Sequence, residues 1–167
     1  MISARYGEVS IHIDAPAERV WSLLSHLDRM GDWSPECYRV RWLDGATSPA
    51  VPGSRFRGSN KFRWIRWSMT CEVKTALPGR ELIFSTLRGT RECVRWRYLL
   101  ETTASGTDLT ESFEVLWLPL EARIFEDHLM VDRDRRREQS MRTTLERIKS
   151  LAESDERSAT AADRRER

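Results

Sequence analysis

The sequence has 167 residues, of which 40% are hydrophobic, and it carries seven Trp and a net charge of +2. A chain of this length and composition can bury a core without disulfides, so we expect a single folded domain. The small net charge gives no general indication of nucleic-acid binding, and no apolar run approaches the roughly 18 residues that a membrane span requires. Three cysteines without a CxxC spacing indicate reduced thiols in a cytoplasmic protein, and argue against a disulfide framework or a zinc site.

The chain begins with a strand and a short helix. Residues 8–14, EVSIHID, alternate between apolar and polar side chains, which predicts a half-buried strand. In the following segment, PAERVWSLLSHLDRMGDWSPE, Pro16 suits a first helical turn and apolar residues recur at helical spacing up to Leu27. Gly31 can end this helix, which places Trp33 on the turn that returns the chain to the sheet.

Six further segments alternate with a period of two residues. The longest begins at Ile65 and is followed by a turn with Pro78 and Gly79. The predicted strands comprise residues 38–44, 54–62, 65–74, 81–87, 94–101 and 107–118. A series of this kind predicts an antiparallel meander with one face toward water.

From Pro119 onward the apolar period changes to 3.6 residues. The stripe consists of Leu120, Ile124, His128, Val131, Met141, Leu145, Ile148 and Ala152. It predicts a long final helix that covers the apolar face of the sheet. Beyond Ser154 the chain has no apolar anchor, so we expect one domain over residues 1–153 and a disordered charged tail over residues 154–167.

The sequence resembles the SRPBCC superfamily, which is also called START-like or Bet v 1-like. The resemblance is carried by VSIHIDAPAERVWSLLSHLDRMGDWSPE, VPGSRFRGSN, WRYLLE, GTDLTESFE and MRTTLERIKSLAE. It implies an α+β helix-grip fold, in which two short helices follow the first strand and a curved seven-stranded antiparallel sheet wraps around a long C-terminal helix. The most similar branch is the bacterial polyketide cyclase/dehydrase-like or lipid-transport-like group. Members of the superfamily carry lipids or other small molecules, cyclise polyketides or assist chaperones, so the resemblance alone does not choose an activity.

Two titratable residues are expected in the interior. Alternation places Glu111 on the same face as Phe113, where burial would raise the pKa of its carboxyl and suit it to act as a general base. Pairing with an arginine is the structural alternative. His128 lies on the apolar stripe of the last helix, as a general base or as a hydrogen-bonded core histidine. His12, on the polar face of the first strand, is expected to be solvated, and no spacing of ligands suggests a metal or another cofactor.

The segment DRDRRREQ interrupts the apolar stripe of the last helix. At helical spacing Asp134 or Arg135, and then Glu138, would pass under the sheet. Polar groups there would line a pocket or form internal ion pairs. The break indicates that the interior is not solidly packed.

The sequence therefore predicts a central cavity that binds a hydrophobic small molecule or lipid, in a carrier or sensor. The expected ligand-binding residues are Trp33, Phe56, Asn60, Trp67, Met69, Phe84, Trp96, Tyr98, Glu111, Phe113, His128 and Val131. One alternative is a polyketide cyclase, aromatase or dehydratase-like enzyme that uses Glu111 or His128, and another is a protein-interaction module of the chaperone-activator type. Neither a nucleic-acid partner nor a membrane span is expected, and the sequence leaves a homodimer open.

Overall fold

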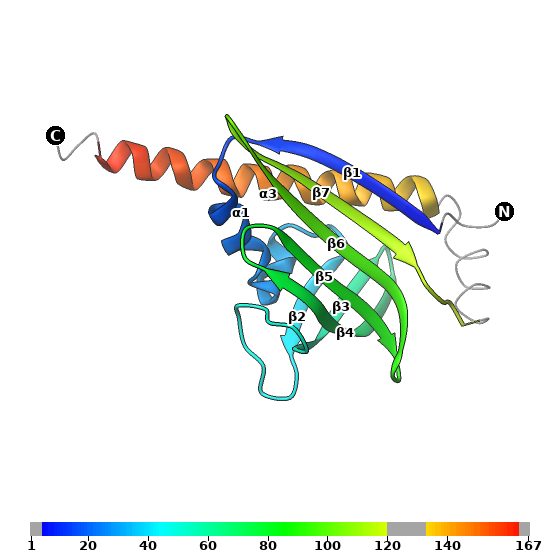
Figure 1. Ribbon diagram of the computed structural model, residues 1–167. Helices are drawn as coiled ribbons and strands as arrows, with labels where there is room; N and C mark the ends of the chain where they lie inside the picture. Colours follow the sequence, from blue (N-terminus) through cyan, green and yellow to red (C-terminus); the bar gives the residue numbers. More distant parts are fainter. Residues whose placement is uncertain (1–4, 120–132, 164–167) are drawn as a thin grey trace.

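The computed structural model describes residues 5–119 and 133–163, with side chains described for residues 5–119 and 135–154. Seven antiparallel strands form one curved sheet in the spatial order β1-β7-β6-β5-β4-β3-β2, and a long helix, α3, runs beside β1 and β7 (Figure 1). This architecture confirms the predicted helix-grip fold. Within the described part of the chain, no helix combines the length and apolarity needed to cross a membrane.

The element boundaries follow the alternation in the sequence to within a few residues. The strands are β1 (Tyr6–Ile13), β2 (Cys37–Trp42), β3 (Arg55–Phe62), β4 (Ile65–Leu77), β5 (Glu81–Arg88), β6 (Arg91–Thr103) and β7 (Gly106–Val115). The helical elements are α1 (Ala17–Leu24), the 3₁₀ helix η1 (Leu27–Asp32) and α3 (Arg133–Asp163). The two short helices after the first strand are therefore present as the family resemblance implies.

The first strand of the chain completes the sheet beside the last one. β1 pairs antiparallel with β7, with Val9 opposite Glu111. Since β1 and β2 lie at opposite edges of the sheet, α1 and η1 have to carry the chain from one edge to the other. Val20 and Leu24 of α1 are buried in the same core as the inner face of the sheet, and this packing fixes the path of the connection.

The apolar stripe of α3 holds the helix against the sheet. Its buried residues are Met141, Leu145, Ile148 and Ala152. They belong to the common core, and α3 contacts β1, β7 and α1. Because full burial of a Leu, Ile or Met side chain contributes roughly 1.5–3 kcal/mol, this stripe provides much of the free energy that docks the helix.

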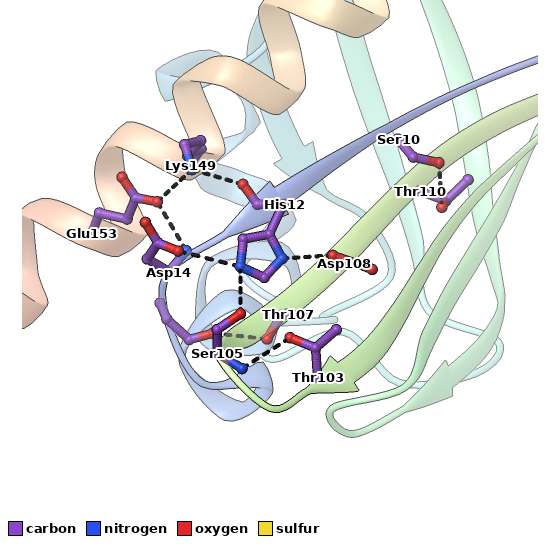
Figure 2. A network of polar contacts seen from close by, with 11 residues as sticks. Ser10, His12, Asp14, Thr103, Ser105, Thr107, Asp108, Thr110, Lys149 and Glu153 are labelled. Atoms are coloured by element: carbon purple, nitrogen blue, oxygen red, sulfur yellow. Dashed lines mark hydrogen bonds and ion pairs between the residues drawn. The ribbon is translucent and has the colours of Figure 1, made fainter.

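A polar network fastens the C-terminal half of α3 to the end of β1 (Figure 2). The Lys149 ammonium donates to the backbone carbonyl of His12 at 2.7 Å and pairs with the Glu153 carboxylate at 2.7 Å. The same carboxylate accepts the backbone N–H of Asp14 at 2.9 Å. These bonds complement the apolar stripe and fix the axial position of the helix relative to the strand.

The described bounds of α3 bear on the C-terminal end of the predicted final helix. α3 begins at Arg133, and the first turns of the predicted helix fall in residues 120–132, which lie outside the described residues. At its other end α3 continues to Asp163, so helical backbone extends into the segment predicted as a tail. That residues 154–167 add nothing to the folded domain stays a prediction.

Removal of residues 155–167 should shift the melting temperature by less than about 2 °C, because these residues include no large apolar side chain. Thermal unfolding followed by circular dichroism compares a chain ending at Ser154 with the full chain. A chain ending at Ile148 is the matched control, since it also removes Lys149 and Glu153, and it should melt clearly lower. A loss of many degrees on the shorter truncation would contradict the prediction.

Candidate functional site

A buried carboxyl group and a buried phenol meet on the inner face of the sheet. Tyr98 of β6 lies directly opposite Glu111 of β7, and each residue is 4% exposed. The Tyr98 hydroxyl donates a hydrogen bond to Glu111 Oε1 at 2.8 Å. Glu111 Oε2 is also buried, and it has no hydrogen-bond partner among the described residues. The inward position of Glu111 thus agrees with the alternation in the sequence. Its described partner is a tyrosine and not the arginine that the non-catalytic interpretation predicts.

Burial controls the protonation of this pair. It raises the pKa of Glu111 from 4.5 to about 8, and the hydrogen bond from Tyr98 offsets part of the effect. Burial, followed by the neighbouring Glu111 carboxyl, raises the pKa of Tyr98 well above its usual value. At neutral pH Glu111 is therefore mainly a neutral acid. Since Oε1 accepts from Tyr98, the acid proton belongs on Oε2, where no described group accepts it.

Aromatic side chains line the inner face beside this pair. Trp96 of β6 lies opposite Phe84 of β5 on one side and Phe113 of β7 on the other. The ring centroids of Trp96 and Phe113 are 5.6 Å apart, and those of Phe56 and Phe84 are 5.4 Å apart. The band of rings therefore spans the sheet from β3 to β7, which gives a largely apolar wall around one carboxyl group.

The curvature of the sheet brings distant strands into one interior. The Cys37 thiol of β2 contributes to the raised pKa of Tyr98, although three strands separate β2 from β6 in the sheet. Gly58 of β3 is buried on this inner face, and a Cβ added there would meet the Cys37 sulfur at 3.6 Å, an ordinary van der Waals distance. The described interior thus has room for at least one more methyl group at this point.

The structure places the other expected ligand-binding residues in three groups. Trp33 is 1% exposed and belongs to the hydrophobic core, so its indole is packed inside. The partly buried residues of the inner face are Asn60, Trp67 and Met69, and Asn60 lies opposite Trp67. His128 and Val131 lie outside the described residues.

In the polar segment of α3, the residue that is buried is not one of those that the sequence predicts. Arg135 and Glu138 are exposed, so their predicted positions under the sheet are wrong, and the buried residue is Arg137, at 7%. Its guanidinium lies 4.5 Å from the centre of the Phe113 ring, a cation–π contact that is strengthened by burial. Arg137 precedes Met141 by one helical turn, so the phase of the buried stripe could have identified it.

His12 lies in a second polar cluster, which has the distances of a Ser-His-Asp triad (Figure 2). Its Nδ1 is 2.7 Å from Asp108 Oδ1, and its Nε2 is 3.2 Å from Ser105 Oγ. Nε2 is also 3.2 Å from Asp14 Oδ1, so this nitrogen faces a carboxylate as well as the Ser105 hydroxyl. In a Ser-His-Asp triad this nitrogen faces the nucleophile, so the second carboxylate departs from the triad arrangement. The contacts of the cluster join the end of β1 to the β6–β7 hairpin. The His12 side chain keeps 38% of its surface exposed on the polar face of β1, in agreement with the predicted solvated position.

The cysteines are free and buried, as expected for reduced thiols. Burial raises the pKa of the Cys37 thiol to about 11 and that of Cys71 further, which leaves both thiols protonated and unreactive at neutral pH. In the part of the chain that the structure describes, no three His, Cys, Asp or Glu side chains are arranged to hold a metal ion. The charged and titratable groups that the described residues place inside, apart from the thiols, are therefore Glu111 with its partner Tyr98, and Arg137 against Phe113.

Comparison with known proteins assigns the family. A family model described as "Polyketide cyclase / dehydrase and lipid transport" matches residues 7–153. The chain belongs to this family. The match confirms the resemblance to the SRPBCC superfamily and to its polyketide cyclase-like branch. No curated protein matches the chain.

Solved structures with the fold of the polyketide cyclase and lipid transport family are similar over most of the chain. The Polyketide_cyc-like protein Cgl2372 from Corynebacterium glutamicum is 33% identical, with 92% of this chain and 88% of that chain covered and a TM-score of 0.51. Protein NE0264 from Nitrosomonas europaea is 15% identical, with coverages of 93% and 99% and a TM-score of 0.64. The di-domain ARO/CYC StfQ from the steffimycin biosynthetic pathway is also 15% identical, with coverages of 90% and 51% and a TM-score of 0.68. The two more distant structures show the fold alone.

The raised pKa of Glu111 predicts a specific pH dependence of stability. Between its unfolded value of 4.5 and its folded value of about 8, the folded state binds one more proton than the unfolded state. The free energy of unfolding should therefore fall by about 1.4 kcal/mol per pH unit over this window because of Glu111, and this contribution should level off above it. Glu111→Gln removes the titration, so the stability of the variant relative to the parent should rise with pH across the same window.

Urea unfolding at a series of pH values measures this difference. Glu114→Gln is the matched control, because Glu114 lies on the same strand but is exposed on the outer face. A stability difference between the parent and Glu111→Gln that stays constant from pH 5 to pH 8 would show that the carboxyl is ionised in the folded protein.

Proposed function

We propose that this chain binds a hydrophobic small molecule or lipid against the concave face of its sheet, as a carrier or sensor in the cytoplasm. The residues proposed to line the site are Trp33, Phe56, Asn60, Trp67, Met69, Phe84, Trp96, Tyr98, Glu111, Phe113, His128 and Val131. The observation that carries the proposal is the buried Glu111 Oε2, which has no described partner in an interior that is mainly apolar and aromatic and that also holds the Arg137 guanidinium against Phe113. A ligand oxygen that accepts its proton would satisfy this group.

The ligand chemistry follows from the same interior. Rings of Phe84, Trp96 and Phe113 offer apolar contact area, and the neutral acid of Glu111 offers one directed hydrogen bond. Apolar walls with a few polar groups are typical of small-molecule sites. Membership of a family that includes lipid transport is consistent with this chemistry.

A cyclase- or dehydratase-like enzyme is the second candidate, and the acid–base character of Glu111 is the observation that favours it. A pKa of about 8 lets the carboxyl donate and accept a proton near neutral pH, and the bond from Tyr98 holds Oε1 in place. StfQ, which is described as an ARO/CYC, shares the fold over half of its length. Binding remains the first proposal because the described hydrogen bonds give the Glu111 side chain one partner, the Tyr98 phenol.

The space beside Gly58 provides the test of ligand binding. Gly58→Leu should weaken binding of the uncharged fluorescent probe N-phenyl-1-naphthylamine at least about tenfold, because the larger side chain fills the volume that the ligand would occupy. Gly58→Ala is the matched control, since its Cβ has only an ordinary contact with the Cys37 sulfur. Fluorescence titration measures the affinity, and circular dichroism checks the fold.

Equal binding of the probe by the parent and the folded Gly58→Leu variant would count against the site. If instead both variants misfold, the glycine is needed for sheet curvature, and the proposed volume has no support from it.

Turnover of a bound ligand separates the two candidate functions. For a carrier, Glu111→Gln and Tyr98→Phe should change ligand affinity by the value of one or two hydrogen bonds and produce no change in chemistry. For an enzyme, loss of proton transfer should lower the rate roughly 10²–10⁴-fold. Ligands found by screening are incubated with the protein and followed by mass and by chromatographic retention, which also detects isomerisation. A product that disappears in either variant would replace the carrier proposal with the enzyme.

A further inference from the structure

A group of arginines lies on the outer face of the sheet, at the edge formed by β2, β3 and β4. Alternation along β2 and β3 turns Arg39, Arg41 and Arg57 away from the buried face that carries Val40 and Gly58. All three arginines are exposed, and none of them has an ion-pair partner among the described residues. Residues 37–72, which include β2, β3 and the first part of β4, carry seven Lys or Arg and two Asp or Glu, whereas the whole chain has a net charge of only +2.

The strand register places like charges directly opposite one another on this face. Arg41 lies opposite Arg57 between β2 and β3, and Lys61 lies opposite Arg66 between β3 and β4. Like charges at directly opposed positions destabilise a sheet. Two such pairs on adjacent strands therefore oppose folding, and a polyanionic partner would neutralise both of them.

Exposed aromatic side chains lie at one end of this basic face. Trp64, in the turn between β3 and β4, is 79% exposed, and Tyr38 at the start of β2 is 41% exposed. The Lys61 ammonium and the Arg66 guanidinium lie 5.6 and 5.8 Å from the centre of the Tyr38 ring, so aromatic and cationic groups share one surface. Trp and Tyr favour the membrane–water interface, and clustered Lys and Arg are attracted to anionic lipid headgroups.

We propose that the outer face of β2, β3 and β4 docks on the surface of an anionic phospholipid membrane, with Trp64 entering the interface. Lipid phosphates neutralise the opposed cations, and the exposed indole gains an interfacial environment. Nucleic acid shares the phosphate chemistry, but the two exposed rings, Trp64 and Tyr38, lie at one end of the face and provide no series of rings along it on which successive bases stack. The proposal concerns the face opposite to the ligand site and is independent of the proposed function.

Vesicle flotation with the full chain tests the proposal. The protein should float with phosphatidylcholine vesicles that contain roughly 30% phosphatidylglycerol, and should stay unbound with phosphatidylcholine alone. An increase in NaCl from about 0.05 M to about 0.5 M should release it, because screening shortens the range of the attraction.

Charge-neutralising variants assign the binding to this face. The combined substitution Arg39→Gln, Arg41→Gln and Arg57→Gln should weaken binding on the order of 100-fold, since each basic residue near an anionic surface contributes about fivefold. The matched control neutralises three exposed arginines elsewhere, Arg80→Gln, Arg142→Gln and Arg147→Gln. It changes the net charge equally and should bind within about threefold of the parent.

Two further measurements guard against loss of folding as an explanation. Relief of the Arg41–Arg57 repulsion should leave the melting temperature of the first triple variant equal to or higher than that of the parent. Trp64→Ser changes an exposed side chain, should fold normally, and should weaken vesicle binding about tenfold through loss of the interfacial indole.

Three results would overturn the proposal. The first is that the parent does not bind anionic vesicles, and the second is that both triple variants lose binding equally. The third is that the protein binds a DNA oligonucleotide more tightly than the vesicles and that Trp64→Ser leaves the DNA affinity unchanged. This result would assign the face to nucleic acid. Vesicle binding that depends on salt, on the three arginines and on Trp64 would support it.

Discussion

The single hydrogen bond from Tyr98 to Glu111 is the polar contact on which the acid–base chemistry of the interior depends. A carboxylate buried among aromatic rings with one donor would be strongly unfavourable, so the group becomes a neutral acid. A neutral acid needs an acceptor for its proton, and the described residues offer none at Oε2. The described residues therefore leave the buried acid proton of Glu111 without a hydrogen-bond acceptor, and a ligand oxygen would supply one.

The fold explains how such a group can be tolerated. β7 lies between β1 and β6, so Glu111 is flanked by Val9 on one strand and Tyr98 on the other. α3 covers this side of the sheet with an apolar stripe, and the Lys149 and Glu153 contacts fix its position at the end of β1. Burial in this core raises the pKa of Glu111, and the strand register supplies the Tyr98 phenol, whose hydrogen bond limits the rise.

The two faces of the sheet have opposite chemistry, and the alternation of the same strands produces both. Along β3, Phe56 and Gly58 point into the apolar interior while Arg57 points to the basic outer face. A ligand site on the concave face and a membrane-docking surface on the outer face can thus be adjacent without sharing a side chain. For a carrier of apolar molecules, such a division would place the protein at the lipid surface from which a ligand could be exchanged.

Much of the fold could be predicted from the sequence, because period-two and period-3.6 patterns fix which residues share a face. The inward position of Glu111 and the buried stripe through Leu145 follow from local spacing alone. The Tyr98 partner and the opposed Arg41–Arg57 pair do not, because they depend on the register between strands that are distant in sequence. The prediction that Glu138 of α3 lies under the sheet is wrong for a related reason. A shift of one or two positions in helical phase is enough to bury Arg137 and expose Glu138.

The most direct test of the central claim is a carbon-13 NMR titration of the glutamate side-chain carboxyls, with the Glu111 signal assigned by its absence in Glu111→Gln. We expect this signal to titrate with a midpoint near 8, because burial favours the neutral acid. The exposed Glu114 on the same strand serves as an internal reference. A midpoint for Glu111 at or below its unfolded value of 4.5 would contradict the account, because the interior would then hold a stable carboxylate and would need no ligand oxygen to accept its proton.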